Sequence, residues 1–354
     1  MNFGSDNQSG ASNKVLQALV EANKGPSAGY GNDEWTVRAE EKLKQVFECE
    51  LKAYFVTSGT AANCLALSCM ANPWDMILCH AHAHIINDEL TAPELFTGGA
   101  RVQGLDENVS KLSSDGLGLF LESFEGHPPH TPMPKVLSLS QLTESGQVYE
   151  LDELQVLCRK AKEYGMTVHM DGARFANALV SLDCTPAEMT WQAGVDVLCL
   201  GASKNGALAA EAVIFFDTTL VHDFEFRRKR SGHLLSKGRY LGAQFLAWLD
   251  QDHWLMLAKQ ANDFARKIAT AINSSEKATL AWPVCGNEVF VLMDEALIDA
   301  LRVQGAIFYE WPMRFLSEGQ LLSGPNAFIL VRLVVSHSTP VIEVNNLVCL
   351  IETT

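Results

Sequence analysis

Short apolar runs alternate with amphipathic helical stretches along the first part of the chain. From about residue 40 to residue 216 the apolar runs are bounded by Gly, Asp and Ser, as the strands of repeated βα units are. Such units build a mostly parallel sheet, because each helical crossover returns the chain to the same edge. The pattern therefore predicts an α/β fold in which the carboxyl ends of successive strands share one edge of the sheet.

One βα unit shows this pattern most clearly. Residues 151–164 carry apolar side chains at helical spacing, and Gly165 follows where a helix commonly ends. A strand, MTVHMD, comes next, followed by a helical crossover within residues 175–193 and by VDVLCLGAS, whose continuous apolar run is typical of a buried strand. We expect these two strands to be parallel, which places Asp171 and Lys204 at strand ends on the same edge.

After Gly242 the pattern changes to that of a smaller α+β domain. A long helix is expected over residues 255–272, and then come a strand in NEVFVLMD, a helix in EALIDALRVQG, strands in AIFYE and AFILVRLVVS, and a last helix. We therefore predict a large domain of residues 1–245, including an N-terminal arm, and a small C-terminal domain of residues 246–354. The boundary is soft, because a long helix can bridge both parts.

Composition restricts the partners and the compartment. The formal net charge of -15 argues against a general nucleic-acid binder, which needs clustered Lys and Arg. Nine cysteines without CxxC spacing are typical of a reduced cytosolic chain. The start, MNFGSDNQSG, is unlike a signal peptide, and no apolar run reaches the length of about 18 residues that a membrane span needs. We expect a cytoplasmic protein without a membrane segment.

The first candidate site follows the apolar residues FV. Ser58, Gly59 and Thr60 open a run of good helix formers, so the free N–H groups and the positive end of a helix dipole would face an anion. Gly59 allows the backbone to approach a phosphate closely. A plain Ser/Thr helix cap gives the same pattern and remains the structural alternative.

Two further motifs lie at the neighbouring strand ends. HMDGAR places Asp171 and Arg174 on the edge where ligands bind in open α/β sheets, although Asp171 could also cap the next helix with Arg174 as its local partner. GASKNG sets Lys204 between small residues at the mouth of a buried strand. Most lysines are solvated surface charges, but partial desolvation at this position suits Schiff-base chemistry with a carbonyl cofactor.

Together the three motifs match the needs of pyridoxal 5′-phosphate. This cofactor requires an anchor for its phosphate, an anion that keeps its ring nitrogen protonated, and an amine linked to its aldehyde. The combination is much more specific than any single motif. The sequence therefore predicts a pyridoxal-phosphate enzyme that acts on the carbon skeleton of a small amino acid, with Lys204 as the reactive lysine.

A histidine-rich segment suggests the strongest alternative. CHAHAHIINDE carries His80, His82 and His84 at alternating positions, and in an extended strand the three imidazoles would share one face, as in the site of a metal-dependent hydrolase. No second His/Asp cluster completes a ligand set, and we therefore predict no metal site. In the pyridoxal interpretation His84 lies flat on the cofactor ring and the other two histidines are structural.

Long, ordered strings run through almost the whole chain: SDN near the start, AGYGNDE, TSGTAAN, AHIINDE with APELF, HMDGARFANALVSL, AEMTWQAGVDVLCLGASKNG, RRKRSGHLLSKGRYLGAQ and VRLVVS. In these strings the chain resembles the low-specificity L-threonine aldolases. These are pyridoxal-phosphate enzymes of the β-eliminating lyase superfamily, with the aspartate-aminotransferase-like fold known as fold type I. The resemblance implies that fold, with a large domain around a mostly parallel sheet and a smaller α+β C-terminal domain.

The resemblance also implies roles for the residues at the cofactor. Lys204 would form the Schiff base with the cofactor, and Asp171 would pair with the pyridine nitrogen. Ser58, Gly59 and Thr60 would hold the phosphate. His84 would stack on the ring and take part in proton transfer.

A second set of implied roles concerns the substrate and the subunit interface. Arg174 and Arg332 would face the cofactor edge and bind the substrate carboxylate, helped by Ser5, because a planar guanidinium binds a carboxylate as a fork. Tyr30 and Arg239 would reach the site of a neighbouring subunit. The family implies a homotetramer built as a dimer of dimers.

One position departs from the family pattern. Many members carry a histidine in the segment that matches SQLTESG, where this chain has Glu144. The catalytic base is therefore left open between His84 and Glu144, and the departure suggests a preference for bulky β-substituents, as in phenylserine. The implied reaction is retro-aldol cleavage of L-threonine, L-allo-threonine and related β-hydroxy-α-amino acids to glycine and an aldehyde. A β-elimination or a serine hydroxymethyl cleavage would use the same cofactor contacts.

Overall fold

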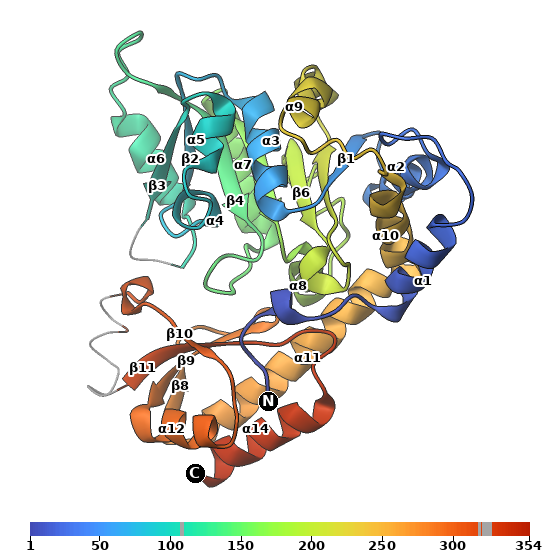
Figure 1. Cartoon of the computed structure of the whole chain (residues 1–354). Coiled ribbons are helices and arrows are strands. Elements are labelled where there is room, and N and C mark those ends of the chain that lie inside the picture. The colour runs from blue at the N-terminus through green and yellow to red at the C-terminus, as the bar shows by residue number, and fades with distance from the viewer. Residues whose placement is uncertain (107–109, 318–319, 321–327) are drawn as a thin grey trace.

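A seven-stranded, mostly parallel sheet forms the larger part of the molecule (Figure 1). The computed structural model describes residues 1–106, 110–317, 320 and 328–354. The strand order is β1-β7-β6-β5-β4-β2-β3, in which only β7 runs antiparallel to its neighbours β6 and β1. The strands are β1 (Lys52–Val56), β2 (Asp75–His80), β3 (Arg101–Leu105), β4 (Met133–Ser140), β5 (Thr167–Gly172), β6 (Val197–Gly201) and β7 (Glu211–Phe215). The predicted parallel sheet is confirmed.

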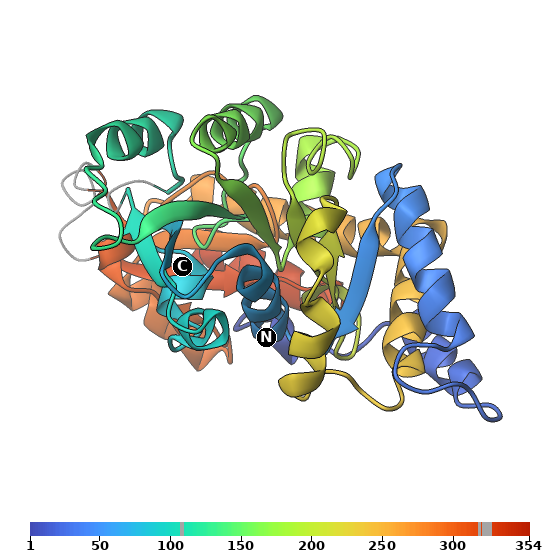
Figure 2. The ribbon, with the colours of Figure 1, turned by 90° about the horizontal axis from the view of Figure 1, so that it is seen from above.

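Helices lie on both faces of this sheet, as Figure 2 shows from above. One face is covered by α3, and α7 packs against β4 and β5 on the other. The helices of this part are α1 (Asn13–Ala22), α2 (Glu34–Phe47), α3 (Gly59–Met70), α4 (His84–Asn87), α5 (Ala92–Thr97), α6 (Ser114–Ser123), α7 (Leu151–Glu163), α8 (Phe175–Leu182), α9 (Phe224–Arg230) and α10 (Arg239–Leu249). Four short 3-10 turns connect them, η1 (Asp6–Gln8), η2 (Ser203–Asn205), η3 (Thr218–Val221) and η4 (Asp250–Asp252).

The continuous apolar runs reflect burial of both sheet faces. Along β6, Val197 and Cys199 face the core on the α3 side, whereas Leu198 and Leu200 face the core on the α7 side. A strand buried on both faces needs no polar alternation. The predicted unit is confirmed in α7, β5, α8 and β6, and β5 pairs with β6 in parallel.

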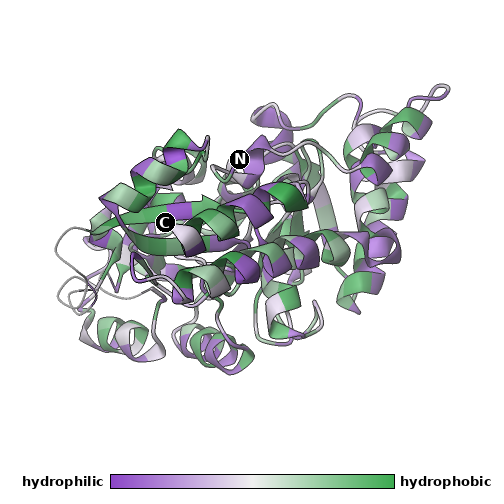
Figure 3. Ribbon diagram, turned by 90° about the horizontal axis from the view of Figure 1, so that it is seen from below, coloured by the Kyte–Doolittle hydropathy of each residue, from purple (hydrophilic) through white to green (hydrophobic). Residues whose placement is uncertain are grey.

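A four-stranded antiparallel sheet, of order β10-β11-β9-β8, forms the smaller part. Its elements are α11 (His253–Asn273), β8 (Ala278–Leu280), β9 (Glu288–Asp294), α12 (Glu295–Val303), β10 (Tyr309–Glu310), η5 (Met313–Phe315), β11 (Phe328–Val334) and α14 (Val341–Thr353). Figure 3 shows the helices with both hydrophilic and hydrophobic stretches, as expected of helices that cover a core. The predicted strand AIFYE is reduced to Tyr309–Glu310, while the preceding Ile307 forms an isolated bridge with Asn2.

The N-terminal residues join the small sheet. Phe3 is fully buried in its core, donates its N–H to Ile307 O (2.8 Å) and accepts the N–H of Val334 (2.8 Å). The long α11 runs along both parts, with Ala258 in the large core and Ala265 in the small one (Figure 1). The domain boundary at residues 245 and 246 stays a prediction.

Two further features bear on the expectations from composition. All nine cysteines are free thiols. Within the residues that the structure describes, no helix is both long enough and apolar enough to cross a membrane.

Candidate functional site

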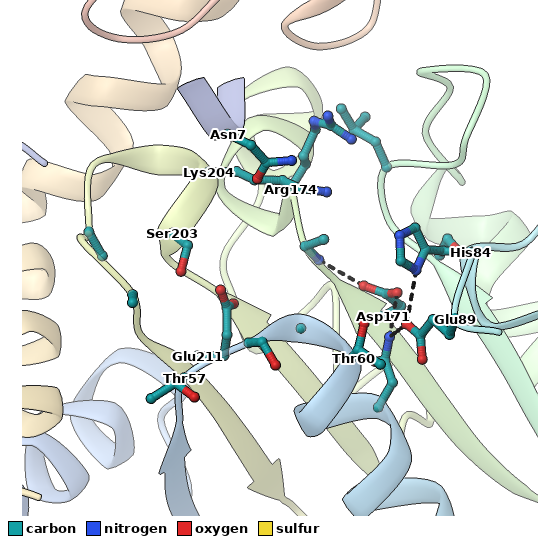
Figure 4. Close-up of a pocket in the computed structure, with 18 of the residues that line it drawn as sticks. Asn7, Thr57, Thr60, His84, Glu89, Asp171, Arg174, Ser203, Lys204 and Glu211 are labelled. Carbon is teal, nitrogen blue, oxygen red and sulfur yellow. Dashed lines mark hydrogen bonds and ion pairs between the residues drawn. The ribbon is translucent and has the colours of Figure 1, made fainter. Parts of the chain in front are cut away.

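A pocket of about 400 Å³ opens at the carboxyl edge of the large sheet (Figure 4). Its walls come from the ends of β1, β4, β5 and β6, from the N-terminus of α3 and from the N-terminal arm. Eight residues singled out in the sequence line it together: Ser58, Gly59, Thr60, His84, Glu144, Asp171, Arg174 and Lys204. The parallel topology brings them together, because it collects strand ends on one edge.

The N-terminus of α3 forms one wall of the pocket. Ser58 is the N-cap of this helix, and its side chain accepts the N–H of Ala61. The structural alternative is therefore correct for the Ser58 hydroxyl. It does not exclude the anion site, since the helix also directs its positive end and its first N–H groups into the pocket with Gly59 and Thr60.

Asp171 lies buried at the end of β5, on the sheet face that α3 covers. Its Oδ2 accepts a hydrogen bond from Asn63 Nδ2 (2.8 Å), and its Oδ1 accepts one from the N–H of Ala173 (3.0 Å). Burial alone would raise the pKa of this carboxyl, but the charge of His84 and the hydrogen bond from Asn63 outweigh it and hold the pKa below its usual value. Asp171 is therefore a fixed anion within the pocket.

His84 is held by a buried carboxylate. Its Nδ1 lies 2.9 Å from Glu89 Oε1, and Asn63 Nδ2 donates to the same oxygen at 2.9 Å. The hydrogen bond to Glu89 raises the pKa of His84. With Nδ1 engaged, the imidazole has only Nε2 left for a ligand in the pocket.

Glu144 is a second acid beside His84. Its Oε1 accepts the backbone N–H of His84 (2.7 Å) and the Ser140 hydroxyl (2.8 Å). Burial, together with the charge of Asp171, raises the pKa of Glu144 to about 7. This carboxyl can therefore take up or release a proton near neutral pH.

Lys204 projects into the pocket from η2, directly after β6 (Figure 4). Its Nζ makes no hydrogen bond or ion pair with any residue in the described part of the chain. Its positive charge nevertheless helps to lower the pKa values of Asp6 and Asp171. The arrangement offers a primary amine, unengaged by hydrogen bonds, within reach of a pocket ligand.

Arg174 and Arg332 belong to a buried ion-pair network. Arg174 forms a fork on Asp6, with Nε–Oδ2 at 2.8 Å and Nη2–Oδ1 at 3.1 Å, and its Nη1 lies 3.2 Å from Glu288 Oε2. Arg332 Nη1 lies 3.6 Å from the other oxygen of Glu288. The guanidinium carbon of Arg332 also lies 4.2 Å from the ring centroid of Trp311. The two arginines are thus linked through one buried carboxylate, although Arg332 does not line the pocket.

Three other predicted residues lie outside the pocket. Ser5 caps η1 by accepting the N–H of Asn7 (3.2 Å). Tyr30 is half-exposed beside Lys229, and Arg239 donates to the carbonyl of Gly25 (2.9 Å). Their roles in binding the cofactor or the substrate stay predictions.

The histidine segment is not extended beyond His80, so the condition for the metal alternative is not met. His80 ends β2, the N–H of Ala83 then closes a turn onto the carbonyl of His80 (2.9 Å), and His84 begins α4. His82 instead packs against Phe315, with ring centroids 4.2 Å apart, and burial lowers its pKa to about 4. The three imidazoles therefore do not form the metal set of the alternative function.

A different group has the spacing of metal ligands. Among the described residues, His84, Glu89 and Asp171 place one potential ligand atom each within 4.8 Å of one another. The Asn63 amide donates to one oxygen of each carboxylate of this group, so these residues already form one hydrogen-bonded cluster. The hydrogen bonds favour a polar network that orients His84 and Asp171.

Sequence reasoning missed several residues of the site. Asn63 lies one helical turn after Gly59, and Glu89 lies within the quoted string AHIINDE, so both carried a local signal. Glu211 lines the pocket as the acid that opens the apolar strand β7. Asp6 lies within the quoted string SDN, but no local pattern pairs Asp6 or Glu288 with Arg174, because both approach it from distant parts of the chain.

The donor set fits the predicted cofactor. Helix N–H groups, a fixed carboxylate and an unengaged amine line one pocket, and about 400 Å³ lies within the usual range for small-molecule sites. Asn63 Oδ1, which belongs to a pocket-lining residue, is a buried atom without a hydrogen-bond partner in the described residues, as polar atoms next to a ligand site are.

Comparisons with known proteins agree with this geometry. Residues 2–296 match the family model described as beta-eliminating lyase. The chain is 41% identical over 317 residues to a low specificity L-threonine aldolase of Pseudomonas aeruginosa, and the alignment covers 90% of each chain. It is 39% identical over 307 residues to the enzyme of that name from a Pseudomonas species, covering 87% and 88%. A solved Leishmania major threonine aldolase superposes with a TM-score of 0.90 at 26% identity, covering 99% of this chain and 98% of that one.

Proposed function

Because the chain belongs to the β-eliminating lyase family, we propose that it is a pyridoxal-phosphate-dependent aldolase. It cleaves L-threonine, L-allo-threonine and related β-hydroxy-α-amino acids to glycine and an aldehyde. The observation that carries this proposal is the meeting of Lys204, Asp171 and the N-terminus of α3 in one pocket. The predicted fold, a mostly parallel sheet with a smaller α+β part, is confirmed by the likeness to a threonine aldolase structure.

The cofactor has a place for each of its functional groups. Pyridoxal phosphate, when bound, supplies an electron sink for the pair released as the bond between Cα and Cβ breaks. Lys204 would hold its aldehyde carbon, Asp171 would keep its ring nitrogen protonated, and His84 would cover the ring. Ser58, Gly59 and Thr60 would hold its phosphate at the positive end of α3.

Arg332 is the main candidate for the substrate carboxylate. Two donors of Arg174 are occupied by the fork on Asp6, and its third contact is Glu288. Arg332 keeps a buried Nε without a partner among the described residues. Arg332 would therefore bind the substrate carboxylate, with Arg174 adding positive charge and Ser5 a hydroxyl. The orientation of the substrate that results would select the bond that breaks.

The proton of the β-hydroxyl needs an acceptor. With a pKa of about 7, Glu144 is partly ionised at neutral pH and can take this proton directly or through a water molecule. The bond to Glu89 fixes the orientation of His84 and raises its pKa, so its protonated form can return a proton. We therefore assign Glu144 as the acceptor and His84 as its partner in proton transfer.

We further propose a cytoplasmic homotetramer, a dimer of dimers in which Tyr30 and Arg239 reach a neighbouring active site. Leu208 lines the pocket and is 61% exposed, and Leu90, next to Glu89, is 93% exposed. A neighbouring subunit that packs on this side of the pocket would cover both leucines. The nine free thiols are consistent with a reducing compartment.

Product analysis tests the proposed reaction. The purified protein, supplied with pyridoxal phosphate and L-threonine, should release glycine and acetaldehyde in equal amounts. 2-Oxobutyrate with ammonia would instead indicate β-elimination, and a requirement for tetrahydrofolate would indicate hydroxymethyl transfer. Activity that is independent of the cofactor and lost to chelators would overturn the proposal in favour of a metal-dependent enzyme.

A further inference from the structure

Glu211 is a buried acid in the pocket that the proposed reaction does not use. It is 7% exposed, lines the pocket and begins β7, where it pairs with Val56 of β1 on one side and Gly201 of β6 on the other. Its side chain lies on the sheet face that α3 covers, like those of Val213 and Phe215 further along the strand. Figure 4 shows it beside Thr57 and Ser203.

This position puts Glu211 in the same pocket as the proposed phosphate-binding residues, on the strand beside the one that leads into them. Val56, the cross-strand partner of Glu211, is followed directly by Thr57 and then by the cap Ser58 of α3. A phosphate at the start of α3 and an ionised Glu211 would therefore compete for the same positive helix end. Two anions in such a buried place repel each other unless one of them is neutralised.

The surrounding residues provide no ion-pair partner for Glu211. Among the described residues, no Lys, Arg or His side chain lies within 4 Å of its carboxylate. The Ser203 hydroxyl and the charge of Lys204, both from η2, favour ionisation of Glu211, and the charge of Asp171 from β5 opposes it. The Cys199 thiol of β6, which is also near Glu211, lies opposite Val213 of β7. Burial is the largest effect and raises the pKa of Glu211 to about 7, so protonation at neutral pH costs little.

We propose that Glu211 is a further ligand of the cofactor phosphate, which it meets as a neutral carboxylic acid that donates its O–H to a phosphate oxygen. Binding of the phosphate then takes up one proton, which ends on the Glu211 carboxyl. This inference rests on the proposed function, because it takes the phosphate at Ser58, Gly59 and Thr60 as given. It assigns to Glu211 a role in cofactor binding that is separate from the chemistry at Lys204.

The direct test is the number of protons taken up on binding. The apoenzyme is titrated calorimetrically with pyridoxal phosphate and with pyridoxal, which lacks the phosphate, in buffers of different ionisation enthalpy. Lys204, His84 and Glu144 should take up or release the same number of protons in both titrations. The difference in proton uptake between the two ligands therefore reports on the phosphate site. At pH 8, where the free phosphate is already a dianion, the phosphorylated ligand should take up about one proton more than pyridoxal, and about half a proton more at pH 7.

Variants assign this proton to Glu211. In Glu211→Gln, whose amide donates at every pH, the uptake of the extra proton should vanish. The Kd of the wild type for pyridoxal phosphate, divided by that of Glu211→Gln, should therefore rise about tenfold per pH unit above 7. Glu211→Ala should bind pyridoxal phosphate about tenfold more weakly at pH 6.5, because a buried donor is lost. Glu144→Gln, which changes another buried acid of the same pocket, should keep the extra proton.

Two results would overturn this role. One is wild-type binding with no extra proton, which needs no variant to fold, and the other is an extra proton that persists in Glu211→Gln. A wild-type protein that binds no pyridoxal phosphate at any pH would instead contradict the proposed function itself.

Discussion

The pocket has two halves that are built in different ways. The proposed cofactor half, made of the α3 N-terminus, Asp171 and Lys204, lies at strand ends of one sheet. The hydrogen-bond partner of Asp171, Asn63, comes from α3, which packs on the same sheet. The proposed substrate half, made of Asp6, Arg174, Glu288 and Arg332, joins the N-terminal arm, the large sheet and the small sheet through buried ion pairs, and of these four residues only Arg174 lines the pocket. The first half therefore depends on the sheet topology alone, whereas the second depends on how the two sheets pack.

This difference has an energetic consequence. Removing one member of a buried ion pair leaves the other charge uncompensated, which costs about 3–5 kcal/mol. Changes in the substrate half should therefore affect packing as well as binding. Changes in the cofactor half should act mainly on the chemistry.

The largest effect is expected for Lys204→Ala. Without this amine no covalent attachment of the cofactor is possible, and activity should fall by at least about a thousandfold together with loss of the visible absorbance band. Lys259→Ala, which removes an exposed lysine on α11, is the control and should keep both. A Lys204→Ala protein that stays yellow and active would show that the cofactor half is wrongly assigned.

Asp171→Asn should lower kcat by about a hundredfold or more, because the amide no longer holds a proton on the ring nitrogen of the cofactor. The substitution keeps the shape of a side chain buried on β5. Thermal unfolding should be measured beside turnover. Full activity in a correctly folded variant would contradict the role of Asp171.

Arg332→Lys should act on substrate binding. A lysine keeps the positive charge but loses the planar fork, so KM for L-threonine should rise by roughly tenfold or more, with a smaller change in kcat. Arg302→Lys, which alters an exposed pair with Glu310 on the same small part, is the control. If kcat fell while KM stayed constant, Arg332 would not be a carboxylate ligand.

The smallest but most diagnostic effect concerns pH. Glu144 must be ionised to accept a proton and has a pKa of about 7, so kcat should fall as pH drops below about 7. Glu144→Gln should lower kcat at pH 8 by roughly tenfold and remove this acidic limb.

Stability gives a second readout for Glu144. Its pKa is raised on folding, so the ionised form destabilises the fold above pH 7 and the cost disappears below its unfolded pKa of 4.5. Glu144→Gln should therefore raise the Tm at pH 8 more than at pH 5. An acidic limb that persists in the variant would leave His84 as the acceptor.

The sequence predicted the cofactor half because its residues follow regular elements. Asp171 ends an apolar strand and Lys204 follows the next, so the βα pattern alone places them on one edge. The substrate half is different. Asp6 approaches Arg174 across 168 positions, and a fork between residues so far apart has no local pattern.

The histidine-rich segment does not meet the condition of the metal alternative, an extended backbone, for a local reason. Alternation predicts a strand only where the backbone stays extended, and the chain turns after His80 because the N–H of Ala83 bonds back to its carbonyl. The contact between Glu144 and the His84 backbone spans 60 positions and was equally invisible. Only the resemblance to the family had pointed to Glu144.

The most direct test of the central claim is to locate the cofactor on the chain. The protein is incubated with pyridoxal phosphate, reduced with borohydride, digested and analysed by mass spectrometry. We predict a single pyridoxyl-phosphate modification on the peptide that contains Lys204. Modification of another lysine, or none with the wild-type protein folded, would contradict the account.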